Sequence, residues 1–252
     1  MEVNKYALDT HTKYALSANT LKLIAALAMF FDHFAAVFFP HDTLWGVLLR
    51  IPGRISAPIM CCMIAEGYHH TSNLKRYITR LLICAVISHI PYNLCFNYSF
   101  FQATSVVWGL ALGLIALAIV KHEDWNILLR IFGLGVCCLL SITANWNYIA
   151  VLWIVAFGVF YGNFRGQMIS FSVIGIFLLI LPSVTNLGFI DYSSPGWNWY
   201  QLGIFLAIPF LILYNGKRGK KSKFMTRFFY VFYPLHLLFI YVLRLCADSL
   251  IG

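Results

Sequence analysis

The sequence is poor in charge. Asp, Glu, Lys and Arg together make up 11% of its 252 residues, less than half of their usual share in a soluble domain. Hydrophobic residues make up 61%, and the mean hydropathy is +0.78. A water-soluble fold cannot bury so much apolar surface. The composition therefore excludes a soluble protein and predicts one all-α polytopic integral membrane domain over residues 1–252.

Several motifs are also missing. None of the seven cysteines forms a CxxC pair, which argues against zinc and thioredoxin-like sites. There is no Walker motif, GxGxxG or GxSxG, so the sequence gives no support for a glycine-rich nucleotide-binding loop or for a serine hydrolase. The run "EGYHH" puts Glu66, His69 and His70 on one helix face, but a di-iron site needs a second Glu-x-x-His. We therefore expect no metal, and interpret these three as solvated residues near a cytoplasmic boundary.

Apolar windows of about 20 residues predict transmembrane helices. Residues 1–18 are polar, and the first apolar segment is too long for a cleavable signal peptide, so we expect a cytoplasmic N-terminal segment followed by a permanent span. A break of the second span at Pro52 would raise the count from nine to ten. The predicted spans are 19–40, 47–69, 76–94, 105–121, 125–142, 147–162, 167–185, 198–215 and 226–246.

The basic residues predict the orientation, because cytoplasmic loops are enriched in Lys and Arg. With Lys5 and Lys13 inside, the inner loops are 70–76, 121–124, 162–167 and 215–225, and each carries a basic residue. The outer loops, 41–46, 95–104, 143–146, 186–197 and the C-terminal tail, carry none. The net charge of +9 is thus a topology signal, and no nucleic-acid partner is expected.

Ionisable groups within the spans carry the functional signal. Each costs about 2.5–3.5 kcal/mol to insert, so such groups usually face the bundle interior and are functional. Lys22 and His33 lie eleven residues apart, on one helix face and about 16 Å along the axis. Asp32 points about a quarter-turn away and is better placed to pair with Arg54 than with His33. The full set is Asp32, His33, Arg50, Arg54, Glu66, Arg80, His89, Arg130 and His236.

Two interpretations of this set remain open. The groups could form a salt-bridge network that only holds helices together, or they could line a functional site. No internal repeat is evident, which weakens a transporter built from inverted repeats. Gly109 and Gly113 form a GxxxG pattern, which predicts a close helix contact.

Four segments closely resemble the TraX family: "LKLIAALAMFFDHFAAVFFP", "GRISAPIMCCMIAEGYHHTSNLKRYITRLL", "ISHIPYNL" and "FFYVFYPLHLLFIYVLR". The resemblance covers nearly the whole chain. The founding TraX protein is associated with N-terminal acetylation of F-type pilin. The family is also similar to acyltransferase-3 and heparan-acetyltransferase-like membrane enzymes. One departure is visible, since the family pattern has an Asp at the start of the sixth span, where this chain has Asn145 and Asn147.

The resemblance implies a multi-pass acetyltransferase of the bacterial cytoplasmic (inner) membrane. It would move an acetyl group from cytoplasmic acetyl-CoA to an unknown extracytoplasmic amine or hydroxyl acceptor. His33 would serve as general base or as acetyl carrier, Asp32 would orient or stabilise it, and Arg54 or His236 would stabilise the oxyanion. The residues expected to hold the CoA phosphates are Lys22, Lys75, Arg76, Arg80, Lys217 and Arg218.

Two rival classes remain. A transporter or channel would use the same intramembrane charges as an ion or proton relay. A membrane scaffold without enzymatic activity would use them for helix packing alone. Substrate flux without acetyl-CoA turnover would identify a transporter or channel. A substitution of His33 that changes no measured activity would identify a scaffold.

Overall fold

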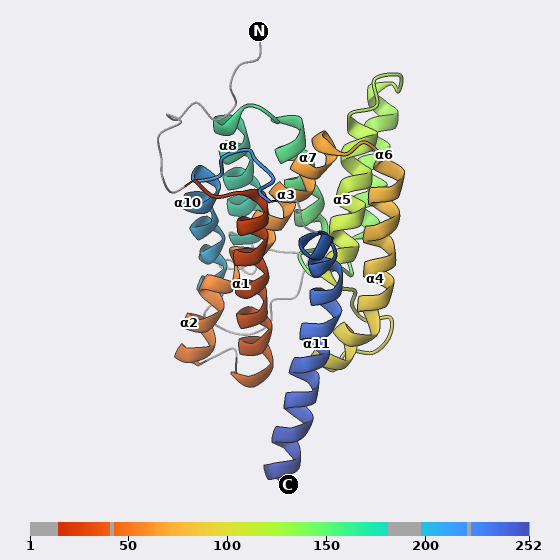
Figure 1. Ribbon diagram of the computed structural model, residues 1–252. Helices are drawn as coiled ribbons and strands as arrows, with labels where there is room; N and C mark the ends of the chain where they lie inside the picture. The colour runs from red at the N-terminus through yellow and green to blue at the C-terminus, as the bar shows by residue number, and fades with distance from the viewer. Residues whose placement is uncertain (1–14, 41–42, 181–197, 221–222, 252) are drawn as a thin grey trace.

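The computed structural model describes residues 15–40, 43–180, 198–220 and 223–251, and these ranges form helices with no extended strand (Figure 1). The chain is thus an all-α polytopic membrane protein, as predicted. Its elements are α1 (Ala18–Phe38), α2 (Leu44–Gly53), α3 (Ser56–His70), α4 (Leu74–Phe96), α5 (Val106–Val120), α6 (Ile127–Leu140), α7 (Asn147–Val159), α8 (Phe164–Gly175), η1 (Ile176–Ile180), η2 (Asn198–Leu206), α10 (Ala207–Ile212) and α11 (Lys223–Ile251).

Nine apolar helical segments in the described ranges correspond to the nine predicted spans. Four are long and apolar enough to cross a membrane: Ala18–Phe38, Leu44–His70, Leu74–Phe96 and Arg227–Leu250. Five are shorter: Val106–Val120, Ile127–Leu140, Asn147–Val159, Phe164–Ile180 and Tyr200–Ile212. Large side chains such as Leu128 and Phe132 are 74% and 69% exposed, as expected for surfaces that lipid covers.

The second span splits beside Pro52, as predicted: α2 ends at Gly53, and α3 begins at Ser56. Pro52 lies inside the last turn of α2, and the Arg54 amide still donates to the Arg50 carbonyl at 3.2 Å. The last helix continues to Ile251 instead of ending at 246, and Figure 1 shows α11 extending past the ends of α1 and α2.

The connections gather at two ends of the bundle, as the alternation of basic loops predicts. At the predicted inner end, the amide of Leu16 donates to the Leu213 carbonyl at 2.8 Å. At the predicted outer end, the amide of Thr104 donates to the Thr143 carbonyl, also at 2.8 Å. Lys5, Lys13 and the loop 186–197 lie outside the described residues. Which end faces the cytoplasm stays a prediction.

Side chains cap most of the helix N-termini. Caps of this kind satisfy first-turn amides that have no partner within the helix. The capping residues with a side-chain bond are Ser17, Thr43, Asn73, Asn126 and Asn163. Ser105, at the start of α5, makes no such bond. At the other end of α4, Arg244 of α11 donates to the carbonyls of Cys95 and Leu94 at 3.1 and 3.2 Å.

The GxxxG pair mediates a close contact between α5 and α7, as predicted. A Cβ placed on Gly113 would lie 2.4 Å from Cδ1 of Ile154, and one on Gly109 would lie 3.8 Å from the Ala150 Cβ, both on α7. In contrast, a Cβ on Gly135 of α6 would meet nothing within 4 Å. The small side chains therefore set how closely α5 and α7 pack.

We predict that Gly113→Leu destabilises the protein, because the added side chain collides with α7. Overpacking of this kind costs about 1–3 kcal/mol or more, which should lower the unfolding temperature measured in detergent. Gly135→Leu is the matched control and should leave that temperature nearly unchanged. Equal melting of the two variants would show that the α5–α7 contact is looser than described.

Candidate functional site

A cavity of about 570 Å³ runs into the bundle. Its lining includes the exposed side chains of His70, Arg80 and Arg218 at the predicted cytoplasmic end. Its deep end reaches the buried side chains of His33 and Arg54. Ligand pockets commonly have volumes of about 300–1,000 Å³, so this space suits an organic ligand that enters from the predicted cytoplasmic end.

One stripe of α1 forms a wall of the cavity along its length. Lys22, Ala26, Met29 and His33 all line it, at spacings of three and four residues that keep them on one helix face. This is the face predicted from the eleven-residue spacing. The stripe places a cation near the entrance and an imidazole at the inner end, about 16 Å apart along the axis.

His33 is held by a second histidine. Its Nδ1 lies 2.9 Å from Nε2 of His236, whose own Nδ1 lies 3.0 Å from the Phe232 carbonyl oxygen. A carbonyl only accepts hydrogen bonds, so Nδ1 of His236 carries the proton and its Nε2 accepts. In a neutral pair, Nδ1 of His33 therefore donates, and Nε2 of His33 keeps its lone pair. Among the described residues, no atom hydrogen-bonds that Nε2, and the ring borders the cavity.

Asp32 pairs with arginine rather than with its neighbour His33, as the helix geometry predicted. Arg54 Nη2 donates to one carboxylate oxygen, and Arg50 Nε lies 3.5 Å from the other. Asp32 and Arg54 are each only 6% exposed. A Cβ on Gly53 would lie 2.3 Å from the Asp32 Cβ, so the glycine permits the close approach of α2 to α1.

Aromatic rings enclose the two guanidinium groups. Arg50 lies 4.3 Å from the centre of the Tyr200 ring, and Arg54 lies 5.0 Å from that of Trp146. Such cation–π contacts stabilise a desolvated cation. Trp146 adopts φ of 69°, a conformation that costs a non-glycine residue about 1–3 kcal/mol and is concentrated at functional sites. Asn145, at the start of the predicted sixth span, also lines the cavity.

The entrance of the cavity carries three cations, from Lys22, Arg80 and Arg218. Lys22 is half-buried, with its Nζ 5.9 Å from the centre of the Phe229 ring. The segment that bears Arg218 is joined to α1, because the amide of Asn19 donates to the Arg218 carbonyl at 3.2 Å. Positive charge from α1, α4 and the segment before α11 is thus gathered around one opening.

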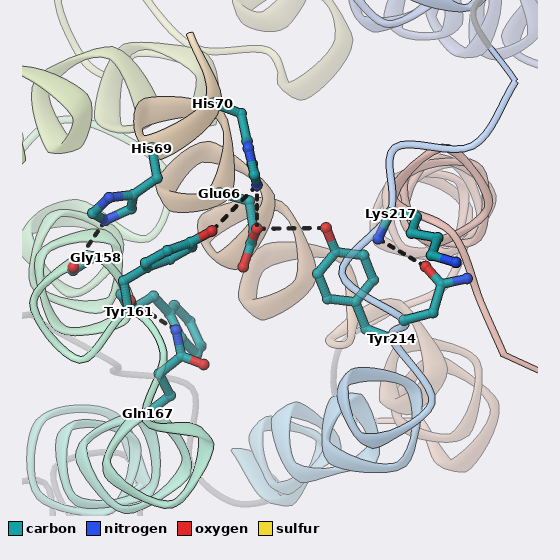
Figure 2. Close-up of polar contacts among 10 residues, drawn as sticks. Glu66, His69, His70, Gly158, Tyr161, Gln167, Tyr214 and Lys217 are labelled. Atoms are coloured by element: carbon teal, nitrogen blue, oxygen red, sulfur yellow. Dashed lines mark hydrogen bonds and ion pairs between the residues drawn. The ribbon is translucent and has the colours of Figure 1, made fainter. Parts of the chain in front are cut away.

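A polar cluster on α3 lies beside this entrance (Figure 2). Glu66 accepts a hydrogen bond from the Tyr214 hydroxyl at 3.5 Å and pairs with His70 at 3.4 Å. His70 in turn contacts the Tyr161 hydroxyl at 3.2 Å, while His69 donates to the Gly158 carbonyl at 3.0 Å. Glu66 is 5% exposed, so the prediction that it is solvated was wrong, because Tyr214 from a distant segment covers it.

These contacts leave no metal site in the cluster. Across the described residues, no three His, Cys, Asp or Glu side chains are grouped to hold a metal ion. The ring of His69 stacks on that of Tyr161 with centroids 3.8 Å apart, and its nitrogen is used by a backbone carbonyl. The cluster therefore ties α3 to the segments after α7 and α10, at the edge of the cavity.

Some residues predicted for the site lie outside the cavity. Lys75 and Arg76 are exposed at the start of α4 and do not line it, and neither does Lys217, whose amide donates to the Asn215 side chain at 2.9 Å. His236 does not line it either. It contacts His33 on the side away from the cavity, so its position suits orienting the His33 ring rather than contacting a ligand.

Other lining residues were missed or misinterpreted from the sequence. Tyr233 lines the cavity beside His33, with ring centroids 6.5 Å apart. Tyr230, three residues earlier, also lines it. Their spacing puts both on one helix face and could have revealed them. Ser105, at the start of α5, does not line the cavity but lies next to Val106, which does, and it is 1% exposed; nothing in the local pattern pointed to it.

Comparisons with known proteins agree on one family. The family described as "TraX protein" matches residues 17–244 of the chain. A "Probable fimbrial assembly protein FimC, serogroup H1" from Dichelobacter nodosus is 29% identical over 231 residues, covering 88% of this chain and 93% of that protein. No solved structure matches the chain.

We predict that Asp32→Asn strongly destabilises the protein. Removing one partner of a buried ion pair leaves uncompensated charge and costs about 3–5 kcal/mol, which thermal unfolding in detergent will measure. Asp124→Asn is the control, because that side chain is 92% exposed and its loss should change little. An unfolding temperature equal to that of the wild type in Asp32→Asn would refute the pairing.

Proposed function

The chain belongs to the TraX family, and on that premise we propose that it is an acetyltransferase of the bacterial inner membrane. It takes an acetyl group from acetyl-CoA at the cytoplasmic side and transfers it to an amine or hydroxyl at the extracytoplasmic side. The observation that carries this proposal is the cavity, because it joins a cationic entrance to the free nitrogen of a buried imidazole.

The dimensions of the cavity fit acetyl-CoA as acyl donor. The pantetheine arm is about 15–20 Å long by its bond count, close to the distance of about 16 Å between Lys22 and His33 along α1. Lys22, Arg80 and Arg218 surround the entrance, where guanidinium and ammonium groups would attract the phosphates. The apolar wall of Ala26 and Met29 suits the arm between these ends.

His33 would act as general base. Its Nε2 accepts the proton of the acceptor amine or hydroxyl as the acceptor atom attacks the thioester carbonyl carbon. The carbon–sulfur bond then breaks, and the imidazolium returns the proton to the departing thiolate, so the products are the acetylated acceptor and CoA thiol. His236 keeps Nε2 of His33 unprotonated, because it occupies Nδ1. In the competing variant, the same nitrogen carries the acetyl group covalently.

The acceptor is proposed from the relative's name. That protein is described as a probable fimbrial assembly protein, and a fimbrial subunit offers a free N-terminal amine. We therefore propose the N-terminal amine of a fimbrial or pilin-like subunit as the first acceptor to test. Surface glycans and small amines are the alternatives.

Purified protein in liposomes with labelled acetyl-CoA on one side tests this function. We expect labelled peptide on the opposite side when a synthetic peptide with a free amino terminus is supplied there. His33→Ala should abolish transfer while leaving the unfolding temperature near that of the wild type. His89→Ala is the control, because His89 contacts the Phe100 carbonyl at 2.8 Å, outside the cavity.

Two results would contradict the proposal. Wild-type activity in His33→Ala removes the assignment of the base. Ion or solute flux without acetyl-CoA turnover would instead favour the transporter or channel.

The cationic entrance gives a separate prediction. Arg218→Ala should raise KM for acetyl-CoA roughly ten- to a hundredfold, since a hydrogen bond to a charged group contributes about 1.5–3 kcal/mol. It should leave KM for S-acetylpantetheine unchanged, because that donor lacks the nucleotide phosphates. Lys121→Ala removes a basic residue that does not line the cavity and should affect neither donor. An equal rise in KM for acetyl-CoA and S-acetylpantetheine would show that Arg218 does not bind the nucleotide phosphates.

A further inference from the structure

Two buried hydroxyl groups lie together at the deep end of the bundle, and neither makes a hydrogen bond of normal geometry. Ser105 is 1% exposed and Tyr233 is 3% exposed. Among the described residues, neither Ser105 Oγ nor Tyr233 Oη makes a hydrogen bond of normal geometry, although the Tyr233 hydroxyl lies close to the Ser105 side chain and the Val106 amide. A buried polar group without a good hydrogen bond is costly and rare in folded proteins. These two hydroxyls are therefore candidates to donate hydrogen bonds to a bound ligand.

The amino terminus of α5 adds further donors at the same place. Ser105 occupies the N-cap position, yet its side chain makes no bond to its own helix, unlike the five side-chain caps described above. The first-turn amides of a helix have no partner within it and carry the positive end of the helix dipole. Val106 and Val107, the first two residues of α5, both line the cavity.

These donors lie next to the proposed base. The ring of Tyr233 meets that of His33 edge-on, at 82° with centroids 6.5 Å apart. Its hydroxyl faces the Ser105 side chain and the Val106 backbone. His33, Tyr233 and the first residues of α5 therefore border one cavity from three different helices, α1, α11 and α5, with Ser105 directly behind the last of these.

We propose that Tyr233, Ser105 and the amino terminus of α5 form the oxyanion site for a thioester carbonyl bound beside His33. The proposal rests on the acetyltransferase function proposed above. It replaces the sequence-based assignment of this role to Arg54 or His236. Arg54 Nη2 is engaged by Asp32, and His236, which contacts His33 and Phe232, does not line the cavity.

The chemistry requires such a site. When the acceptor atom bonds to the carbonyl carbon, the electron pair of the C=O double bond moves to the oxygen. Hydroxyl donors and a helix N-terminus stabilise that negative charge without adding a buried countercharge. When the double bond reforms, the carbon–sulfur bond breaks and the sulfur takes the proton held by His33.

Tyr233→Phe tests the proposal, because it removes one hydroxyl and nothing else. We expect kcat for acetyl transfer from acetyl-CoA to a peptide with a free amino terminus to fall about a hundred- to a thousandfold, the usual effect of losing one oxyanion donor. KM for acetyl-CoA should stay unchanged. Ser105→Ala should lower kcat in the same way. Tyr241→Phe, on the same helix but outside the cavity lining, is the matched control and should retain wild-type kcat.

Thermal stability separates this role from a structural one. A hydroxyl that makes no hydrogen bond of normal geometry contributes little to the stability of the fold, so Tyr233→Phe should melt near the wild-type temperature. A kcat within threefold of the wild type, or a lowered unfolding temperature that accounts for the lost activity, overturns the oxyanion assignment alone. A wild-type protein that does not turn over acetyl-CoA overturns the proposed function and this site with it.

Discussion

The buried ion pair between Asp32 and Arg54 fixes the geometry on which the site depends. Each charge alone would cost about 2.5–3.5 kcal/mol within a membrane, so the two side chains must meet. Because successive helix residues are 100° apart, an α1 that turns Asp32 toward Arg54 necessarily turns His33 toward the cavity. Arg54 lies in the break between α2 and α3. The position of that break therefore determines which way the His33 side chain on α1 points.

The histidine pair adds a second constraint of the same kind. A backbone carbonyl of α11 sets the tautomer of His236, and His236 sets that of His33. Because the two histidines bond to each other and to a backbone carbonyl, neither ring uses a carboxylate. Asp32 can therefore pair with Arg50 and Arg54. The arrangement leaves His33 neutral, with a lone pair on Nε2 that can accept a hydrogen bond or a proton.

Polarity changes along the cavity in the order that an acyl donor would require. Cations surround the entrance, small and apolar side chains of α1 form the wall, and unsatisfied donors lie at the end. At the entrance, Glu66 and His70 of α3 contact Tyr214 and Tyr161. These contacts hold α3 against the two segments that follow α7 and α10. Under the proposed function, the acetyl group would reach the deep end of the cavity on a long arm, while the nucleotide would stay at the entrance.

The sequence by itself determined the apolar segments, the alternation of basic loops, the stripe of Lys22 and His33 on α1, and the pairing of Asp32 with arginine. These features follow from composition and from the helical repeat, which act within one segment or between neighbouring ones. Only the tertiary structure decided that His236 lies behind His33, 203 residues away, that Lys75 and Arg76 lie outside the cavity, and that Ser105 meets Tyr233. Contacts between distant helices depend on how each helix is rotated and packed against the others, and hydropathy carries no information about that rotation.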